Sequence, residues 1–189
     1  DNGLLPLSCD KKIAVIGDFA NTPRYQGAGS AKVTPTQLET SLGCLQESKL
    51  QIIGYAPGFE RLDRENEALL REAVALAQSA DVILLYLGLS ENDEAEGLDR
   101  TTLRLPKNQL RLLSVLVQTG TPIAVVLTCG CVVDVSWRDQ CQALLYDPLC
   151  GQAGARAMAD ILVGNICPSG HLAETFPLRE EDLPARPES

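Results

Sequence analysis

The chain has 189 residues, enough for one domain with a sizeable hydrophobic core. Hydrophobic residues make up 45% and charged residues 22%, a balance that excludes a disordered or fibrous protein. The formal net charge of -9 argues against a nucleic-acid partner and against docking on an anionic membrane, because both need a basic surface.

Membrane-spanning and targeting segments are not recognisable in the sequence. No apolar run approaches the roughly 18 residues that a membrane-spanning helix needs, and no secretory leader precedes the first apolar run. Because the chain opens with Asp1 rather than with methionine, we expect it to be a processed form or a piece of a longer protein.

The cysteines indicate a reducing environment. There are seven of them, an odd number without C-x-x-C pairs, which fits poorly with a complete disulfide framework. A zinc site would need paired Cys and His ligands, and the only histidine is His171. We therefore expect reduced, mostly structural thiols, no metal or cofactor, and a cytoplasmic location.

Short apolar runs and helical patterns alternate along the chain. The apolar runs predict strands at residues 12–17, 50–55, 82–87, 122–127 and 143–146, and a last short extended piece at 172–176. Periodic apolar residues predict helices at residues 63–80, 107–118 and 152–163, the last two stopped by Gly120 and Gly164. A shorter helix is expected at 36–42, with Thr34 or Thr36 as its N-cap.

This alternation predicts an α/β fold. The strands are continuously apolar and aromatic residues make up only 4% of the chain, which suits a parallel sheet covered by helices. We expect one domain at residues 12–177: an open, mainly parallel sheet of about five to six strands with helices on both faces, a three-layer sandwich. Residues 1–11 would form a linker, and residues 178–189, rich in charge and proline, a loose C-terminal tail.

The loop at residues 88–106, called the acidic loop below, is the first candidate for a site. It follows a predicted buried strand, and open α/β sheets bind ligands at the carboxyl ends of their strands. Five acids stand within nine of its residues: Glu91, Asp93, Glu94, Glu96 and Asp99. Glu96 is distinguished by Gly97, which allows a tight turn that presents the side chain, and Asp99 could form a local ion pair with Arg100. The alternative, which composition alone favours, is a solvated loop without chemistry.

Other polar features are weaker candidates. The loop after the first strand contains Gly-Ala-Gly-Ser at 27–30, but it has neither G-x-G-x-x-G spacing nor a following Gly-Lys-Ser/Thr. A turn that brings Ser30 near a polar ligand is therefore favoured over a nucleotide-binding domain. His171 has no visible triad partner and is expected to be a surface or edge residue. Trp137 could stack on a sugar or pack on the end of the sheet.

Five segments stand in an order that points to a known family. They are KIAVIG at 12–17, RYQGAGS at 24–30, AEGLDR at 95–100, LRLP-x-x-Q at 103–109 and GQAGARAMADILVGNICPSGHLAETFP at 151–177. Together with the opening NGLLPL at 2–7, they resemble the carboxy-terminal α/β sandwich domain of glycoside hydrolase family 3, the β-glucosidase and β-xylosidase family. The resemblance spans nearly the whole chain.

The resemblance implies an active site shared between two domains. In the family, an amino-terminal TIM-like barrel carries the aspartate nucleophile and most glucose-binding groups, and the sandwich domain contributes the acid/base glutamate. That glutamate falls on Glu96, and the serine that lies near the sugar falls on Ser30. Arg24 is expected either to order its loop or to reach the substrate at the rim of the pocket. The residues expected to shape the acidic loop are Gly97, Asp99 and Arg100.

The chain also departs from the family pattern. It has Cys-Gly-Cys-Val-Val at 129–133, where relatives usually carry Asn-Gly-Ser/Thr-Pro-Val, and its 189 residues contain no barrel. We therefore expect it to act on β-glucosides as the C-terminal domain of a retaining β-glycosidase, a β-glucosidase first of all, and to be inactive without the barrel. The alternative is a non-catalytic carbohydrate-binding or domain-interaction module. Hydrolase and phosphorylase are not separated, since that choice depends on the barrel.

Overall fold

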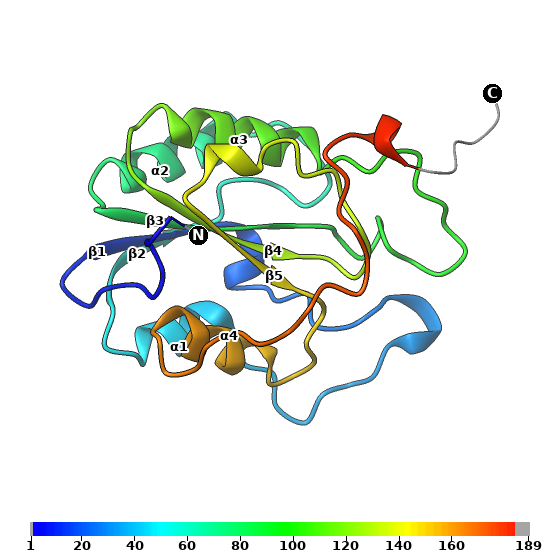
Figure 1. The fold of residues 1–189 in the computed structure, drawn as a ribbon, viewed down its shortest axis with the longest axis horizontal. Coiled ribbons are helices and arrows are strands. Elements are labelled where there is room, and N and C mark those ends of the chain that lie inside the picture. Colours follow the sequence, from blue (N-terminus) through cyan, green and yellow to red (C-terminus); the bar gives the residue numbers. More distant parts are fainter. Residues whose placement is uncertain (1, 184–189) are drawn as a thin grey trace.

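An open, parallel sheet of five strands forms the middle layer of the molecule in the computed structural model, which describes residues 2–183 (Figure 1). The strands are β1 (Lys12–Ile16), β2 (Gln51–Ala56), β3 (Val82–Gly88), β4 (Ile123–Thr128) and β5 (Ala143–Asp147), in the spatial order β2-β1-β3-β4-β5. All neighbouring strands pair in parallel. The predicted α/β fold is confirmed.

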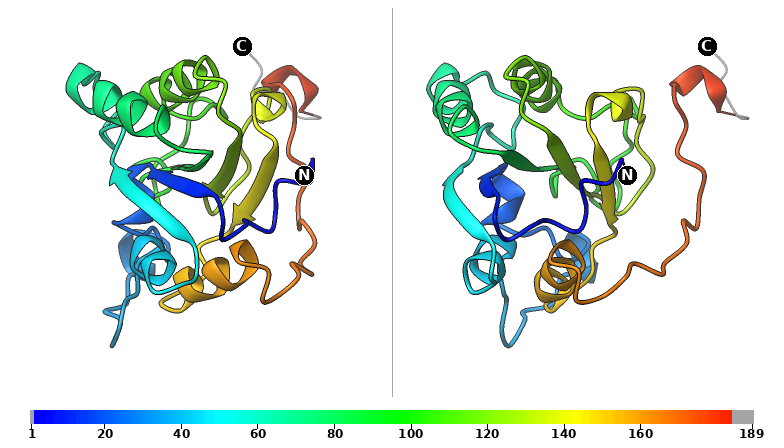
Figure 2. Two further views of the ribbon diagram at one scale, coloured as in Figure 1. Left: turned by 90° about the vertical axis from the view of Figure 1, so that its left-hand side faces the viewer. Right: turned by 60° about the vertical axis from the view of Figure 1, so that its left-hand side comes forward.

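Helices cover both faces of the sheet. α2 (Glu67–Ala77) and α3 (Lys107–Val117) lie on one face, and α1 (Ser41–Gln46) and α4 (Gly154–Leu162) lie on the other (Figures 1 and 2). The central strand β3 is buried along its whole length. Its side chains point alternately to the two faces, so a strand covered on both sides must be apolar at every position. This explains the continuous apolar runs in the sequence.

The short helix predicted at residues 36–42 is wrong in its position. The helix in this region, α1, begins at Ser41, and Thr40 caps it instead of Thr34 or Thr36. The Thr40 hydroxyl accepts a hydrogen bond from the Gly43 amide at 3.0 Å. Thr40 is the residue whose hydroxyl accepts from an amide of the first helical turn, so the helix begins directly after it.

Helix α2 begins later than the predicted residue 63. The side chain of Asn66 accepts hydrogen bonds from the amides of Ala68 and Leu69, at 3.2 and 3.3 Å, and so caps the helix. Asp63 has a left-handed φ of 53°, which cannot continue into a right-handed helix. The strongly periodic part of the pattern, from Glu67 to Ala77, is helical as predicted.

The segment that follows α4 runs past the edge strand β5 to the opposite face of the sheet (Figure 2). The extended piece predicted at 172–176 joins no strand in the described chain. The Phe176 ring contacts Tyr146 of β5, with the ring centres 5.0 Å apart, and Glu180 accepts a hydrogen bond from the Thr102 hydroxyl at 2.6 Å. Of the tail predicted to be loose, residues 184–189 lie outside the described residues. Across residues 2–183, none of the helices combines the length and the apolar character needed to span a membrane.

Candidate active site

Three loops meet at the carboxyl edge of the sheet. They follow β1, β3 and β4, and the middle one is the acidic loop. Because the strands are parallel, their carboxyl ends lie along one edge of the sheet. Strands β3 and β4 approach closely there: a Cβ at Gly88 would stand 2.0 Å from the Thr128 carbonyl oxygen, so only glycine fits where the acidic loop leaves the sheet.

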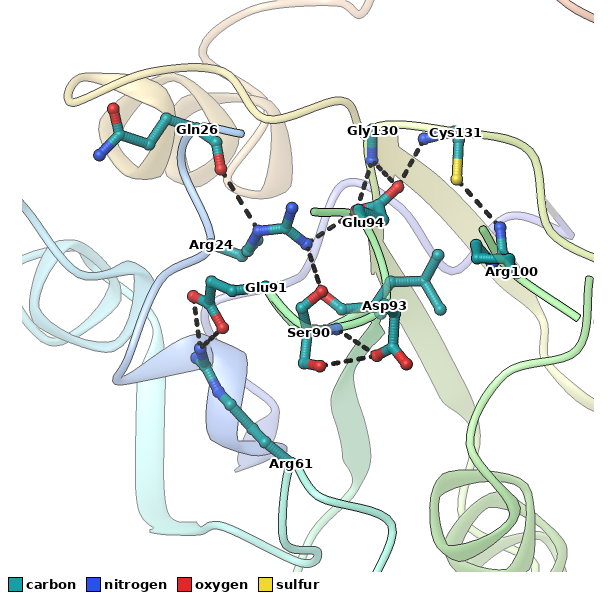
Figure 3. Close-up of polar contacts among 12 residues, drawn as sticks. Arg24, Gln26, Arg61, Ser90, Glu91, Asp93, Glu94, Arg100, Gly130 and Cys131 are labelled. Atoms are coloured by element: carbon teal, nitrogen blue, oxygen red, sulfur yellow. Dashed lines mark hydrogen bonds and ion pairs between the residues drawn. The ribbon is translucent and has the colours of Figure 1, made fainter. Parts of the chain in front are cut away.

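A buried ion pair joins the loop after β1 to the acidic loop. Nη1 of Arg24 lies 2.7 Å from Oε2 of Glu94, and the two side chains are 1% and 7% exposed. The same nitrogen donates hydrogen bonds to the carbonyl oxygens of Leu89 and Ser90, at 2.8 and 3.0 Å. One arginine therefore holds the start of the acidic loop at three points (Figure 3).

Glu94 also connects the acidic loop to the loop after β4. Its carboxylate accepts hydrogen bonds from the amide of Gly130, at 2.9 and 3.1 Å, and from the amide of Cys131, at 2.8 Å (Figure 3). With Arg24, three donor groups converge on one carboxylate, which compensates for the loss of water around its charge. Burial, together with Glu94, raises the pKa of the Cys131 thiol to about 11, so this thiol is neutral at neutral pH.

Arg100 makes a second connection between the same two loops. Its Nη1 donates a hydrogen bond to the Val132 carbonyl oxygen and contacts Sγ of Cys131, both at 2.9 Å. Arg100 thus turns toward the loop after β4 and not toward Asp99, which is exposed. The local ion pair considered between Asp99 and Arg100 is therefore not the contact that fixes this loop. Residues 94–100 are instead attached at both ends to the loop after β4.

Glu96 lies between these two attachments and is exposed to solvent. The Ser30 hydroxyl donates a hydrogen bond to Oε2 of Glu96. Gly97 has a φ of 79°, in the left-handed region that favours glycine, so the tight turn expected after Glu96 is present. The fold therefore brings together Glu96 and Ser30, which are 66 residues apart in the sequence.

Two further acids of the loop have structural partners. Asp93 accepts hydrogen bonds from the amide and the hydroxyl of Ser90, at 2.8 and 2.7 Å. Glu91 forms an ion pair with Arg61 at 3.0 Å (Figure 3). Together with Glu94, these acids shape the loop, whereas Glu96 faces solvent beside a serine. The contacts of these side chains thus distinguish Glu96 from the other three acids, which composition alone could not do.

The weaker candidates from the sequence lie elsewhere. Trp137 is buried in the hydrophobic core and its ring N–H donates to the Asp134 carbonyl oxygen at 2.9 Å, so it is not free to stack on a sugar. His171 is exposed, as expected. A groove of about 720 Å³ lies between the acidic loop and the start of α3, and neither Glu96 nor Ser30 lines it.

Comparison with known proteins identifies the family. The sequence model of the glycosyl hydrolase family 3 C-terminal domain matches residues 1–189. The chain belongs to glycosyl hydrolase family 3. It is 41% identical to an exo-α-(1->6)-L-arabinopyranosidase of Bifidobacterium longum, over 98% of this chain and 26% of that protein. It is 38% identical to the thermostable β-glucosidase B of Acetivibrio thermocellus, over 98% of this chain and 25% of that protein.

Solved structures agree with this assignment. The family 3 β-glucosidase of Bifidobacterium adolescentis matches 97% of this chain with a TM-score of 0.91 and 43% sequence identity, over 27% of its own chain. A β-glucosidase of Listeria innocua in complex with isofagomine matches 96% of this chain with a TM-score of 0.87 and 27% identity, over 25% of its own chain. The resemblance inferred from sequence motifs is confirmed. This family 3 domain spans about a quarter of the length of these relatives.

Sequence reasoning did not single out Glu94, although this residue organises the site of the family 3 domain. The sequence pointed to a role for Glu94 only indirectly. An arginine such as Arg24 in a loop at the sheet edge needs an acceptor, and the acidic loop was expected at the same edge. That constraint leaves five acids and cannot choose among them, because the choice depends on the path of the loop backbone in space.

Proposed function

We propose that this family 3 domain supplies the general acid/base of a retaining β-glycosidase and that Glu96 is that residue. The observation that carries the proposal is the setting of Glu96: an exposed carboxylate within a loop that is attached on both sides through Glu94 and Arg100. A solvated loop would have no reason to be attached in this way. Proton transfer, by contrast, requires a carboxyl group held within hydrogen-bonding reach of one oxygen atom.

In the proposed reaction, Glu96 acts twice. Its carboxylic acid donates a proton to the glycosidic oxygen while the bond to the sugar breaks and an aspartate of the barrel forms a covalent glycosyl intermediate. Its carboxylate then accepts a proton from the water that releases the sugar. Contact with the barrel would favour the neutral acid before the first step, because removal of water disfavours the charged form.

Ser30 and Arg24 support Glu96 in different ways. The Ser30 hydroxyl, hydrogen-bonded to Glu96, can orient the carboxylate or contact a hydroxyl group of the sugar. Arg24 is 3% exposed, and its Nη1 bonds only the acidic loop. These contacts favour a positioning role for Arg24 over direct binding of the substrate.

The remaining parts of the active site are proposed to lie on a barrel domain. A retaining mechanism needs a second carboxyl group about 5–5.5 Å from the acid/base, and Glu94 is unsuited to that role because three donor groups occupy it. The domain alone is therefore inactive in this proposal. The substrate is a β-glucoside first of all. Relatives of this domain are named as an arabinopyranosidase and a xylosidase, so similar domains occur in enzymes that act on different sugars. The barrel is therefore proposed to determine the sugar specificity, and also the choice between hydrolysis and phosphorolysis.

A cytoplasmic location belongs to the same proposal. It is supported by the odd number of cysteines and by the lack of C-x-x-C pairs, which fit poorly with a complete disulfide framework.

Substitution of Glu96 in the complete enzyme tests the function. Glu96→Gln should lower kcat/KM for an unactivated β-glucoside roughly 10²- to 10⁴-fold, because general acid catalysis is lost. Azide should restore turnover of an activated aryl glucoside by Glu96→Ala, since azide needs no general base. Asp99→Asn, an exposed acid in the same loop, is the matched control and should leave the rate nearly unchanged.

Two results would overturn the proposal. Full activity of Glu96→Gln, or no rescue by azide, would favour the alternative of a non-catalytic carbohydrate-binding or domain-interaction module. Turnover of an aryl β-glucoside by the isolated domain would contradict its dependence on a barrel.

A further inference from the structure

Buried polar atoms without a partner converge beneath the active-site loops. The described residues contain five buried side-chain atoms that have no hydrogen-bond partner, and three of these atoms belong to residues that line one small pocket. They are Nη2 of Arg24, Oη of Tyr86 and Oδ1 of Asp147. The three residues come from the loop after β1, from β3 and from the end of β5. They are therefore distant in the sequence, and the fold brings them together.

The pocket lies on the face of the sheet that α1 and α4 cover. Its lining also includes Ser41 of α1, Gly154 of α4, Thr128 of β4, Glu39 and Cys150, whose thiol lies close enough to influence the ionisation of Asp147. Its volume is about 20 Å³, the space open to the centre of a water molecule. One water needs roughly 10–15 Å³ by the same measure and two to four polar partners. The pocket meets both requirements for a single water molecule.

The charges around the pocket favour a neutral occupant. An anion would meet the acidic side chains of Asp147 and Glu39, and a cation would meet the guanidinium of Arg24. Water satisfies both, because it accepts a hydrogen bond from Arg24, donates one to Asp147, and can either donate to Tyr86 or accept from it. Arg24 is already paired with Glu94 through Nη1, and its unpartnered nitrogen points away from Ser90 (Figure 3).

We propose that this pocket holds one ordered water molecule, which bridges Nη2 of Arg24, Oη of Tyr86 and Oδ1 of Asp147. The water completes the hydrogen bonds of Arg24 and links it to the end of β5. Since Arg24 holds the acidic loop through Glu94, Leu89 and Ser90, the water becomes part of the support of that loop. This inference does not depend on the catalytic role proposed for Glu96.

A crystal structure that resolves ordered water tests the proposal directly. We expect one density peak within about 2.7–3.2 Å of all three atoms. An empty pocket, a metal or halide ion in it, or a side chain that fills it would overturn the proposal.

The thermal stability of Tyr86→Phe gives a second test, whose sign distinguishes a wet pocket from a dry one. Around a bound water, the variant loses a hydrogen bond of the buried hydroxyl, and the Tm should fall by about 2–4 °C. In a dry pocket the same variant removes a buried hydroxyl that has no partner, and the Tm should rise or stay unchanged. Either of these last results contradicts the proposal.

Ser41 provides the control, because its hydroxyl lies close enough to influence the ionisation of Tyr86 and is the alternative partner of the Tyr86 hydroxyl. Tyr86→Phe is therefore also measured in a Ser41→Ala background. With a bridging water the loss of Tm persists in that background. Disappearance of the loss would make Ser41 the partner of Tyr86 and would overturn the proposal.

Discussion

Glu94 and Glu91 lie three residues apart in the acidic loop, yet their charges meet different surroundings. The Glu94 side chain is 7% exposed and paired with a buried arginine, whereas the Glu91 side chain is 49% exposed and paired with Arg61 at the surface. Water can replace the partner of an exposed charge but not that of a buried one. A buried charge that loses its partner therefore keeps the full cost of its desolvation.

Substitution of these two acids should separate the two kinds of ion pair. Glu94→Gln leaves Arg24 buried without a counter-charge and should lower the free energy of unfolding by about 3–5 kcal/mol. Glu91→Gln, the matched control, should lower it by less than about 1 kcal/mol. Urea unfolding of the purified variants at neutral pH measures both values. Similar losses for the two variants would refute a structural role specific to Glu94.

The helices and strands differ in how fully local sequence determines them. Each strand is an apolar run, because both faces of the sheet are covered, and all five were predicted close to their observed bounds. Helix ends depend on single capping side chains, so α1 was misplaced and α2 was predicted to start too early. The segment at 172–176 suggested a further extended piece, but a strand also needs a neighbouring strand to pair with, and this segment has none in the described sheet.

The cap of α2 can be tested on its own. Asn66→Ala removes the acceptor for the amides of Ala68 and Leu69 and should lower the free energy of unfolding by about 1 kcal/mol. Asn66→Ser keeps an oxygen that can accept from the helix amides, and like Asn66→Ala it lacks the amide that donates to Glu60 at 2.8 Å, so it should retain more of the stability than Asn66→Ala. Thermal unfolding of the two variants beside the parent protein is the measurement. A loss in Asn66→Ser as large as in Asn66→Ala would show that the cap is not the cause.

At the scale of the whole molecule, the layers around the sheet cover tyrosine side chains as well as aliphatic ones. Burial, with the Asp18 charge as a smaller cause, raises the pKa of Tyr55 to about 12. Burial also raises the pKa of Tyr146 to about 12. A tyrosine in an unfolded chain loses its proton near pH 10. Between about pH 10 and 12 the folded protein therefore holds more protons than the unfolded chain.

Stability should accordingly fall as the pH rises through this alkaline window. The slope of the unfolding free energy with pH is negative wherever the folded state binds more protons, so the contribution of each tyrosine is complete below pH 10 and is lost toward pH 12. Urea unfolding at a series of pH values, for the parent protein and for Tyr55→Phe, measures this. Tyr55→Phe should show a shallower decline, and an identical decline would exclude Tyr55 as a contributor.

The sequence by itself determined the class of the fold and the candidate acid/base. Apolar runs and helical periodicity are local properties, and they survive in the structure because each element buries the side of itself that the pattern marks. The family motif around 95–100 singled out Glu96 among five acids, and Gly97 has the positive φ expected there. These conclusions needed no knowledge of how the elements are arranged.

Only the tertiary structure decided which groups meet. Arg24 and Glu94 are 70 residues apart, and Glu94 and Cys131 are 37 apart. These groups become neighbours because the order β2-β1-β3-β4-β5 sets the loops after β1, β3 and β4 side by side. The energy of an ion pair or hydrogen bond depends on distance and burial, which a linear pattern does not contain. The support of Glu96 therefore became visible only once the parallel sheet had placed its loops.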